Sequence, residues 1–470
     1  MRTTYEGWPR HLGAAFGIVA LSCMIAPAGP ARADTTKSAT LSLPQAQATA
    51  LQALKSGDAT LAARLARALV QANPENSGPY FILAQAHRQL GDRYLARRAA
   101  ALAFRYAKTP EDRFTAAQIA AKLAYDDKRF TASQYWLRRS LDPAPNARLK
   151  QQAIRDFKRV RAENPWSAHL TFSVSPSDNV NSGAQSPYNL IEGLPVVGLL
   201  SPGAQALSGV VARADVDAAY RIAQSATSQT RLTFRATTQQ VSLSSSAKAA
   251  APGLSGSDFS SVYASFGLTH AWKAGENGYA QAGVSLGRSW YGGAPYYDFA
   301  RADLSRSFAL GPQGRLSLAA GYEHRDFATN TPVSQLAQLR FNYQHSFASG
   351  DALQTGLSLG RTFSDAINND NRSATAYITY QPARKIGPAR LSLTLGASRT
   401  TYDAYSVGFL AVPGGREDDS RFAAAALHFD DFSYAGFAPT LTLQTRATTS
   451  NVSRFDTQET TLSISLKSNF

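Results

Sequence analysis

Two patterns of hydrophobic positions divide the chain. From Leu43 to about Glu163, apolar residues recur at helical spacing in a segment rich in Ala, Leu, Arg and Gln. After Trp166, apolar and polar residues alternate with period two in many separate segments. One such segment alternates Leu391, Leu393 and Leu395 with Ser392, Thr394 and Gly396. The pattern predicts a helical domain at 43–165 followed by a strand-rich domain at 166–470.

The helical segment repeats itself. The Gly-Asp pair at 57–58 recurs at 91–92, which is 91 − 57 = 34 residues later, and Ala62 recurs as Ala96 at the same offset. Ala132 continues the series at 132 − 96 = 36 residues. A 34-residue period with small residues where paired helices approach is typical of tetratricopeptide repeats. A generic alanine-rich helical bundle is the alternative.

The strand-rich segment predicts fourteen strands joined by connections of alternating length. The expected strands are 169–176, 208–223, 229–243, 258–272, 278–291, 297–310, 314–328, 334–347, 352–363, 371–384, 389–402, 419–432, 438–450 and 457–470. Every second connection is tight, and the others are generally longer, above all 177–207, 244–257 and 403–418. This alternation is typical of a transmembrane β-barrel and is not expected of a soluble β-sandwich. We therefore predict an α + β multidomain chain, in which a tetratricopeptide-like solenoid precedes a closed, 14-stranded antiparallel barrel.

The N-terminus predicts export. Arg2 and Arg10 precede an apolar run, and Ala31-Arg32-Ala33 has the small-x-small pattern of a signal peptidase site. We expect a signal peptide at 1–33 and a linker at 34–42. At the other end, Leu462, Ile464 and Leu466 alternate up to Phe470, which resembles the signal read by the bacterial barrel-assembly machinery. Aromatic residues near strand ends fit interfacial girdles, so outer-membrane lipid is an expected partner.

Composition narrows the function classes. The mean hydropathy of −0.25 excludes a polytopic helical membrane protein, and Tyr 20 with Phe 23 excludes wholesale disorder. One cysteine excludes a disulfide scaffold and a cysteine-based metal site. The net charge of +15 is concentrated in the helical segment, and nucleic acid is not expected as a partner of an exported protein. Candidate client-binding residues are Arg64, Arg67, Arg97 and Arg98, with a solvated helix face as the alternative.

No motif predicts catalysis. The seven histidines stand apart from H-E-x-x-H, H-x-x-E-H and G-x-S-x-G patterns. His324 beside Arg325 and Asp326 is among the best candidates for a base, and a structural role is favoured for it. No phosphate-binding glycine loop or metal-ligand spacing occurs, so we expect no enzyme, metal or cofactor.

The connection at 177–207 is too apolar for a solvated loop. The residues that make it so are Leu190, Ile191, Val196, Val197 and Leu199. We predict either that it folds inward as a plug or lines the client path, or that it packs against the outer rim or lipopolysaccharide.

The join between the two domains carries a family resemblance. Pro165 ends the last helix, and an Asn/Asp/Gly cluster follows the first strand. The order of helices, Asn-Pro-Trp step, strand and P-S-D-N-x-N-S-G turn resembles the surface lipoprotein assembly modifiers over essentially the whole mature chain. The motif residues are Asn164, Pro165, Trp166, Pro176, Asn179 and Asn181.

The resemblance implies an outer-membrane translocator. Such a protein moves a specific lipoprotein or soluble client from periplasm to cell surface. The helical domain would engage the client in the periplasm, and the barrel would give the exit path. Whether the client crosses unfolded or folds as it emerges stays open. The alternatives are an exopolysaccharide export barrel with a tetratricopeptide domain and a plain porin.

Overall fold

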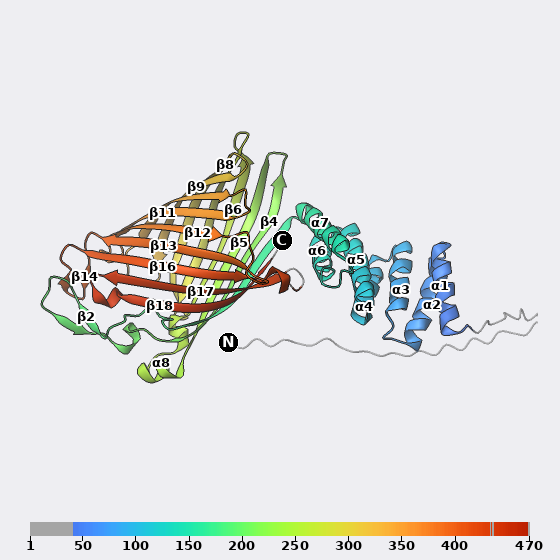
Figure 1. Cartoon of the computed structure of the whole chain (residues 1–470), viewed down its shortest axis with the longest axis horizontal. Coiled ribbons are helices and arrows are strands. Elements are labelled where there is room, and N and C mark those ends of the chain that lie inside the picture. The colour runs from blue at the N-terminus through green and yellow to red at the C-terminus, as the bar shows by residue number, and fades with distance from the viewer. Residues whose placement is uncertain (1–40, 433, 435–436, 469–470) are drawn as a thin grey trace, which may run out of the picture.

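The computed structural model describes residues 41–432, 434 and 437–468. A helical domain extends from one end of a closed barrel, as Figure 1 shows. This arrangement confirms the predicted fold class. The predicted export signal and Phe470 lie outside the described residues. We call the end of the barrel that joins the helices the helix end and the opposite end the loop end.

The helical domain is a series of antiparallel helix pairs. Its helices are α1 (Leu43–Lys55), α2 (Ala59–Ala72), α3 (Ser77–Gln89), α4 (Arg93–Tyr106), α5 (Pro110–Asp126), α6 (Phe130–Arg139) and α7 (Ala147–Glu163). Consecutive helices pack against each other, and alanines dominate the core between them because small side chains let the backbones approach. Among the core alanines are Ala50, Ala62, Ala66, Ala84, Ala96 and Ala100. Tyr80 stacks on Tyr106 across this core, with ring centroids 5.5 Å apart.

The turn inside each helix pair explains the sequence repeat. Gly57 and Gly91 adopt positive φ of 87° and 78°, and the next residue, Asp58 or Asp92, caps the following helix through its carboxylate. In the third pair, Lys128 occupies this turn position and adopts φ of 58°.

This offset of 37 residues, from 91 to 128, corrects the expected register of the third repeat. The residue equivalent to Ala96 is Ser133 rather than Ala132, because Ser133 is the fully buried one (1% exposed). Its hydroxyl donates a hydrogen bond of 2.9 Å to the carbonyl oxygen of Ala121. The hydroxyl is satisfied locally, so a polar side chain fits between the helices.

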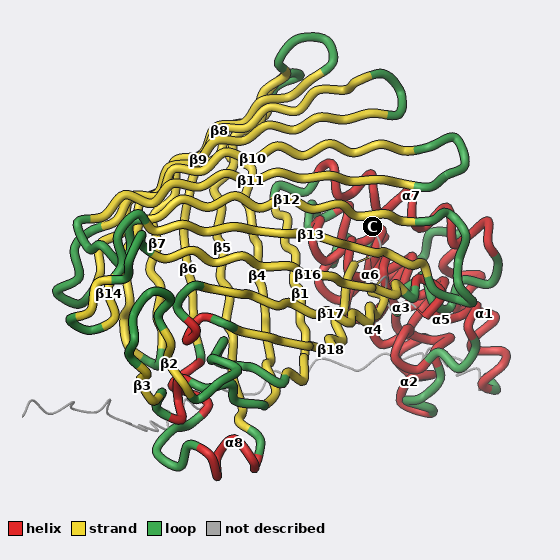
Figure 2. Tube along the Cα trace, turned by 60° about the vertical axis from the view of Figure 1, so that its left-hand side comes forward, coloured by secondary structure: helices red, strands yellow, loops and turns green. Residues whose placement is uncertain are grey.

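Within the described residues, fourteen antiparallel strands close into a barrel, in which β1 pairs with both β4 and β18 (Figure 2). The strands are β1 (Trp166–Ser177), β4 (Gly209–Gln224), β5 (Ser228–Leu243), β6 (Ser261–Lys273), β7 (Gly278–Tyr291), β8 (Ala294–Leu310), β9 (Gly314–Phe327), β10 (Ser334–Ser346), β11 (Ala352–Ser364), β12 (Asn371–Gln381), β13 (Arg390–Tyr402), β16 (Arg416–His428), β17 (Phe437–Ser450) and β18 (Thr457–Ser468). The strand expected at 419–432 is wrong in its bounds. Strand β16 begins at Arg416, because its charged start pairs residue by residue with β13.

The loop end carries the small remaining elements. Strands β2 (Tyr188–Leu190) and β3 (Val197–Leu199) form a hairpin after β1, and α8 (Ser245–Ala250) follows β5. Strands β14 (Ser406–Val407) and β15 (Leu410–Ala411) form a second hairpin after β13. The sequence did not predict these elements. Across the described residues, every helix is too short or too polar to span a membrane.

The barrel wall has an apolar face and a polar face. Leu286 is 67% exposed and Leu395 is 61% exposed, and cross-strand partners on the same face are apolar as well. The alternate residues form hydrogen bonds and ion pairs with one another, as Tyr377 does with Asn342 and Gln354. Because successive residues of a strand point to opposite faces, the apolar face is the exterior and the polar face lines the lumen.

Candidate functional site

The seam between the first and last barrel strands is paired over part of its length. Four Cα partners join β1 to β18, at Phe172–Leu466, Ser173–Ser465, Val174–Ile464 and Ser177–Thr461. By contrast, β1 pairs with β4 along all of Trp166–Ser177. Lys467 and Ser468, which would face Thr171 and Leu170 in this register, pair with β17 and not with β1. Among the described residues, the seam is therefore paired towards the loop end and unpaired at Leu170 and Thr171, towards the helix end.

Asn179 latches the closed part of the seam. It is 2% exposed, and its Nδ2 donates to the carbonyl oxygens of Gly183 (2.9 Å) and Gln458 (3.1 Å). Its Oδ1 accepts from the Gly183 amide at 2.7 Å. Asp178 accepts from the Thr460 amide at 2.7 Å. Side chains from the end of β1 thus replace ladder hydrogen bonds to β18 at the loop end.

Asn181 organises the long connection that follows β1. Its Nδ2 donates to the carbonyl oxygens of Gly203 (3.0 Å) and Gln205 (2.7 Å), and its Oδ1 accepts from the Leu207 amide at 2.9 Å. Pro176 lies opposite Val210 in the β1–β4 ladder. The motif residues of this turn therefore hold the loop end together, through satisfied side-chain amides of the kind that specify one backbone path.

The Asn-Pro-Trp step fixes the helical domain to the barrel. Asn164 is 7% exposed, and its Nδ2 donates to Thr131 Oγ1 (3.1 Å) and Gln134 Oε1 (2.6 Å) of α6. Its Oδ1 accepts from the Trp166 amide at 3.0 Å. The side chain of one residue therefore ties α6 to the first residue of β1.

Arg221 of β4 reinforces this junction. Its guanidinium donates to the carbonyl oxygens of Ala162 (2.9 Å) and Glu163 (2.8 Å), which end α7, and its amide donates to Pro165 O at 2.8 Å. A cation at a helix C-terminus interacts favourably with the helix dipole. Sequence reasoning missed Arg221, because nothing near it along the chain shows that β4 ends beside α7.

A cleft of about 700 Å³ lies between the helical domain and the helix end of the seam. Helices α6 and α7 form one side of it, and the starts of β1 and β17 together with the end of β18 form the other. Its exposed aromatic residues are Tyr135, Trp166, Phe432 and Tyr434. We call this the junction cleft. It adjoins the part of β1 that β18 leaves unpaired.

Two arginines line the junction cleft against aromatic rings. The guanidinium of Arg138 lies 5.0 Å from the centroid of Phe157 and 4.8 Å from that of Phe437. That of Arg139 lies 6.0 Å from the ring of Tyr434. Burial, together with the nearby Arg161, lowers the pKa of Arg138 below its ordinary value. These stacked arginines join α6 to the turn before β17 and give the cleft a cationic wall beside an apolar one.

The sequence-predicted client-binding arginines lie elsewhere in the helical domain. Arg64, Arg67 and Arg98 are exposed on α2 and α4. Arg97 is partly buried and forms an ion pair with Asp127, to which Arg93 Nε also lies close at 3.4 Å. Arg97 therefore has a structural contact across the α4–α5–α6 packing. Client binding by these residues stays a prediction.

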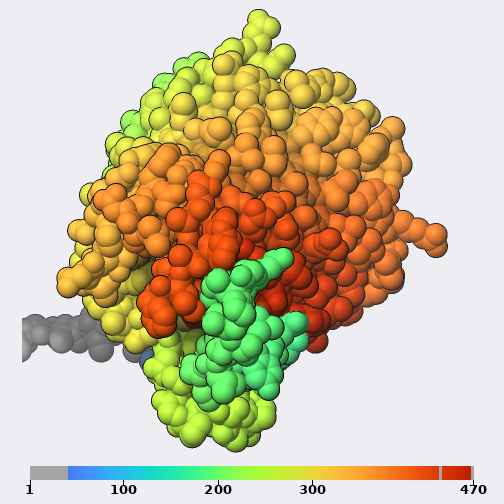
Figure 3. Space-filling model, turned by 90° about the vertical axis from the view of Figure 1, so that its left-hand side faces the viewer, coloured from blue at the N-terminus to red at the C-terminus, as the bar shows by residue number. Residues whose placement is uncertain are grey.

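The apolar segment after β1 lies at the loop end. Ile191 is 4% exposed and packs on Val412 and Val452 of neighbouring connections. The Leu190 amide donates to Ser453 Oγ at 2.7 Å. Figure 3 shows this segment, in green, on the outer surface beside the red C-terminal strands. Leu190, Val196, Val197 and Leu199 are exposed, and the plug role stays a prediction.

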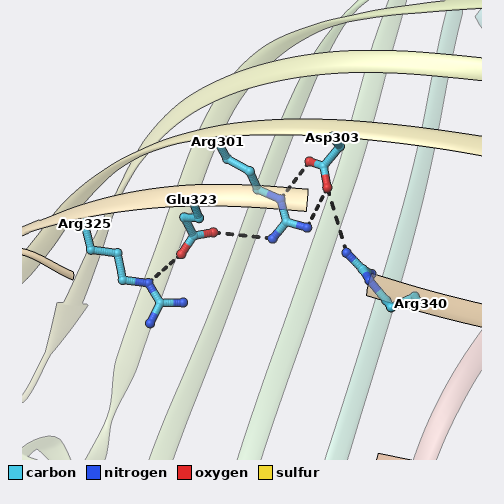
Figure 4. A network of polar contacts seen from close by, with 5 residues as sticks. All are labelled: Arg301, Asp303, Glu323, Arg325 and Arg340. Atoms are coloured by element: carbon cyan, nitrogen blue, oxygen red, sulfur yellow. Dashed lines mark hydrogen bonds and ion pairs between the residues drawn. The ribbon is translucent and has the colours of Figure 1, made fainter. Parts of the chain in front are cut away.

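A charged network crosses the lumen wall on β8, β9 and β10 (Figure 4). Arg301 donates to both oxygens of Asp303 at 2.7 Å and to Glu323 Oε2 at 3.3 Å. Arg325 Nε donates to Glu323 Oε1 at 2.6 Å, and Arg340 lies 3.8 Å from Asp303. Sequence reasoning missed this network, because its members are far apart along the chain and meet only through register.

The candidate base His324 does not face the lumen. His324 lies on the exterior face, because it shares that face with Tyr322 and Ala320 of β9. In the described part of the chain, no group of three or more His, Cys, Asp or Glu side chains is placed to hold a metal.

The sequence profile of the surface lipoprotein assembly modifiers matches residues 166–470, which is the whole barrel. The chain belongs to the surface lipoprotein assembly modifier family. Family and fold point to a transport or assembly barrel rather than an enzyme, and a closed 14-stranded barrel fits the outer membrane. Among curated proteins, no relative matches the chain.

Solved structures resemble one part of the chain at a time. The type III secretion translocator chaperone SycD of Yersinia enterocolitica is 17% identical, covers 26% of this chain and 88% of its own, and has a TM-score of 0.23. A loop-deletion mutant of the outer-membrane protein OmpT of Vibrio cholerae is 10% identical, with 65% and 99% coverage and a TM-score of 0.34. An outer-membrane channel of Pseudomonas putida F1 is 11% identical, with 64% and 94% coverage and a TM-score of 0.33.

Proposed function

We propose that this member of the family moves a specific client lipoprotein, or a soluble client protein, from the periplasm to the cell surface. The helical domain lies in the periplasm and engages the client there. The client then leaves by way of the barrel, at the β1–β18 seam. The barrel-assembly machinery inserts the protein, and outer-membrane lipid surrounds it.

The observation that carries this proposal is the position of the junction cleft against the unpaired part of the seam. Trp166 and the three residues that follow it line the cleft, and the next two residues of β1, Leu170 and Thr171, have no β18 partner among the described residues. A client held between α6, α7 and β1 is therefore already beside the least paired part of the wall. Among the strand pairs of the described barrel, β1 and β18 share the fewest Cα partners, four, so this is the pair whose separation disrupts the shortest ladder.

The stacked arginines support the same route. Arg138 and Arg139 give the periplasmic side of the cleft two cationic groups, and the rings of Phe437 and Tyr434 beside them give it aromatic faces. Such a surface accepts an extended peptide with acidic and apolar residues without requiring one fixed sequence.

Surface labelling tests the proposal. Cells that lack this gene and cells complemented with it are treated with a membrane-impermeant biotin reagent, and the labelled proteins are identified by mass spectrometry. We expect one or a few exported proteins to lose surface labelling in the deletion strain while their total amounts stay unchanged. A complementing variant with Arg138→Ala and Arg139→Ala should restore little of the labelling.

Two results would contradict the proposal. One is an unchanged set of surface proteins accompanied by slower uptake of small solutes, which would indicate a porin. The other is loss of a surface polysaccharide alone. A matched control is Arg88→Ala with Arg105→Ala, which removes the same charge from the helical domain away from the cleft and should restore labelling fully.

A further inference from the structure

Arg421 is a charged residue on the exterior of the barrel, next to its apolar belt. Arg421 of β16 pairs with Ala397 of β13 and with Ala447 of β17. Two residues along β16, Ala423 pairs with Leu395, which is 61% exposed on the exterior face. Because every second residue of a strand shares a face and directly paired residues share it too, Arg421 lies on the exterior.

The neighbouring residue confirms this orientation. Phe422 follows Arg421 and lies opposite Gly396, which has no side chain and leaves room for the phenyl ring. The guanidinium of Arg446 lies over the Phe422 ring, 5.0 Å from its centroid. Phe422 and Arg446 therefore share the lumen face, and Arg421 points the other way.

Arg421 lies at the edge of the apolar belt. On the exterior face of β16, Glu417 and Asp419 precede it towards the loop end, whereas Ala423, Ala425 and Leu427 follow it towards the helix end. Charge on a lipid-facing barrel surface is most costly at the bilayer midplane and costs little near the interfaces. Arg421 thus lies at the depth where lipid headgroups meet acyl chains.

Arg421 differs from its exterior neighbours in lacking a carboxylate. Arg399 forms an ion pair with Glu417, and Arg372 pairs with Asp403 at 2.5 Å. Arg421 is exposed and forms no ion pair or hydrogen bond with any residue that the structure describes. A guanidinium at the membrane surface without a carboxylate partner can pair with an anionic lipid group.

The wall beside Arg421 is hollowed. An open groove of about 760 Å³ runs over the exterior of β12, β13, β16 and β17. Small side chains form its floor, namely Ala376, Ala397, Ala423, Thr445 and Ala447. A second groove of about 800 Å³ adjoins it over β9–β13, and Arg361, Arg372 and Arg399 line that groove. The Nη1 of Arg361 is buried and lacks a hydrogen-bond partner among the described atoms.

We propose that Arg421 and the two grooves form a binding site for a phosphorylated, multiply acylated glycolipid of the outer leaflet. Arg421 holds a phosphate through the paired N–H donors of its guanidinium, and acyl chains lie in the grooves. Two adjoining grooves under one cationic edge fit several acyl chains on a single headgroup. The proposal rests on the barrel spanning the outer membrane and does not depend on client transport.

Native mass spectrometry tests the site on the full-length protein in detergent. The probes are purified deep-rough lipopolysaccharide, the same glycolipid stripped of its phosphates, and phosphatidylglycerol. We expect Arg421→Ala to weaken binding of the first probe at least tenfold. Arg446→Ala is the matched control, because it removes the same charge from the next strand on the lumen face and should leave binding unchanged.

A second neutral variant, Arg421→Gln, keeps the length of the side chain and should bind as weakly as Arg421→Ala. Folding of each variant is checked by the mobility shift that folded barrels show on unheated gels. The proposal fails if Arg421→Ala binds like the wild type, if Arg446→Ala loses binding instead, or if the wild type binds the dephosphorylated glycolipid or phosphatidylglycerol as tightly as the intact probe.

Discussion

The side-chain amide of Asn179 donates a 3.1 Å hydrogen bond to the backbone carbonyl oxygen of Gln458, so a residue just after the first barrel strand holds the last one. The two positions are 279 residues apart along the chain. Asn179 is buried, and one of the backbone groups that it bonds, at Gly183, is buried with it. This side chain therefore reinforces the seam at the loop end, beside the Asp178–Thr460 hydrogen bond and the β1–β18 ladder.

Replacing Asn179 by Ala should weaken this end of the barrel. The change removes the Asn179 donors to the carbonyl oxygens of Gly183 and Gln458, and leaving the buried one, at Gly183, unsatisfied costs about 1–3 kcal/mol. We expect a lower unfolding temperature on the gel-shift assay. Asn368→Ala is the matched control, because that exposed asparagine also bridges two connections, through Ser406, but lies away from the seam. Equal losses in both variants would argue against a special latch.

A disulfide across the seam should block export reversibly. Ser173 and Ser465 are Cα partners in the short β1–β18 ladder, and the sequence has one cysteine, at position 23. In a Cys23→Ser background, Ser173→Cys with Ser465→Cys should cut surface delivery of the client at least tenfold when oxidised, and dithiothreitol should restore it.

The control for that disulfide joins another strand pair. Ser305 and Ala319 are partners in the fully paired β8–β9 ladder, so the corresponding double cysteine variant should export normally in either redox state. Normal export by the oxidised seam variant would show that the client does not need the seam to open.

Lys128→Gly should stabilise the helical domain. Lys128 adopts φ of 58°, where a residue with a Cβ is strained by about 1 kcal/mol and glycine is not. Gly91→Ala should destabilise the domain, because Gly91 adopts φ of 78°, where a residue with a Cβ is strained. A Cβ at Gly91 would meet no other atom within 4 Å, so the cost comes from the backbone conformation. The helical melting transition, followed by circular dichroism at the helix band, measures both changes. A destabilised Lys128→Gly variant would contradict the assigned strain.

The helical domain should lose stability as pH falls below the ordinary histidine range. His87 of α3 is buried, and burial, followed by the charge of Arg67, lowers its pKa below 6.5, while Asp92 acts weakly in the opposite direction. The unfolded chain therefore binds a proton more readily than the folded one. The contribution of His87 to stability is therefore fully present above about pH 6.5, and it decreases as the pH drops towards the pKa of His87 in the folded protein.

His87→Leu removes this titration and keeps an apolar side chain in the core. Its helical melting temperature should vary less between pH 7 and pH 5 than that of the wild type. Identical pH dependence in the two proteins would assign the effect to other groups.

The sequence predicted the architecture because apolar residues follow two simple periods, helical spacing in the first domain and alternation in the barrel. The bounds of the helical domain at Leu43 and Glu163 and most strand bounds follow from the spacing of apolar residues. A helix that packs on its neighbours has apolar residues at every third or fourth position, and a strand with one face towards lipid has them at every second position. The predicted start of strand β16 was wrong because the charged residues Arg416, Glu417 and Asp418 are typical of a loop. In the barrel, Arg416 and Asp418 bond each other, and Glu417 bonds Arg399.

The site was less accessible to such reasoning. The motif asparagines were recognisable as turn formers, but their partners, such as Gln458 for Asn179, become neighbours only when the barrel closes. The junction cleft likewise needs Phe432 and Tyr434 to lie beside α6, and no local pattern around those residues indicates this. The third repeat was wrongly aligned on Ala132, because Lys128 occupies the turn position at which the other two repeats have glycine.

The turn between β7 and β8 is only Gly292-Gly293, both with positive φ. With the helical domain in the periplasm, as proposed, this hairpin presents almost nothing above the outer surface, while the connections after β1, β5 and β13 rise around the rest of the rim. Antibodies raised against the folded protein should therefore bind intact cells through those three connections and leave the diglycine side unlabelled.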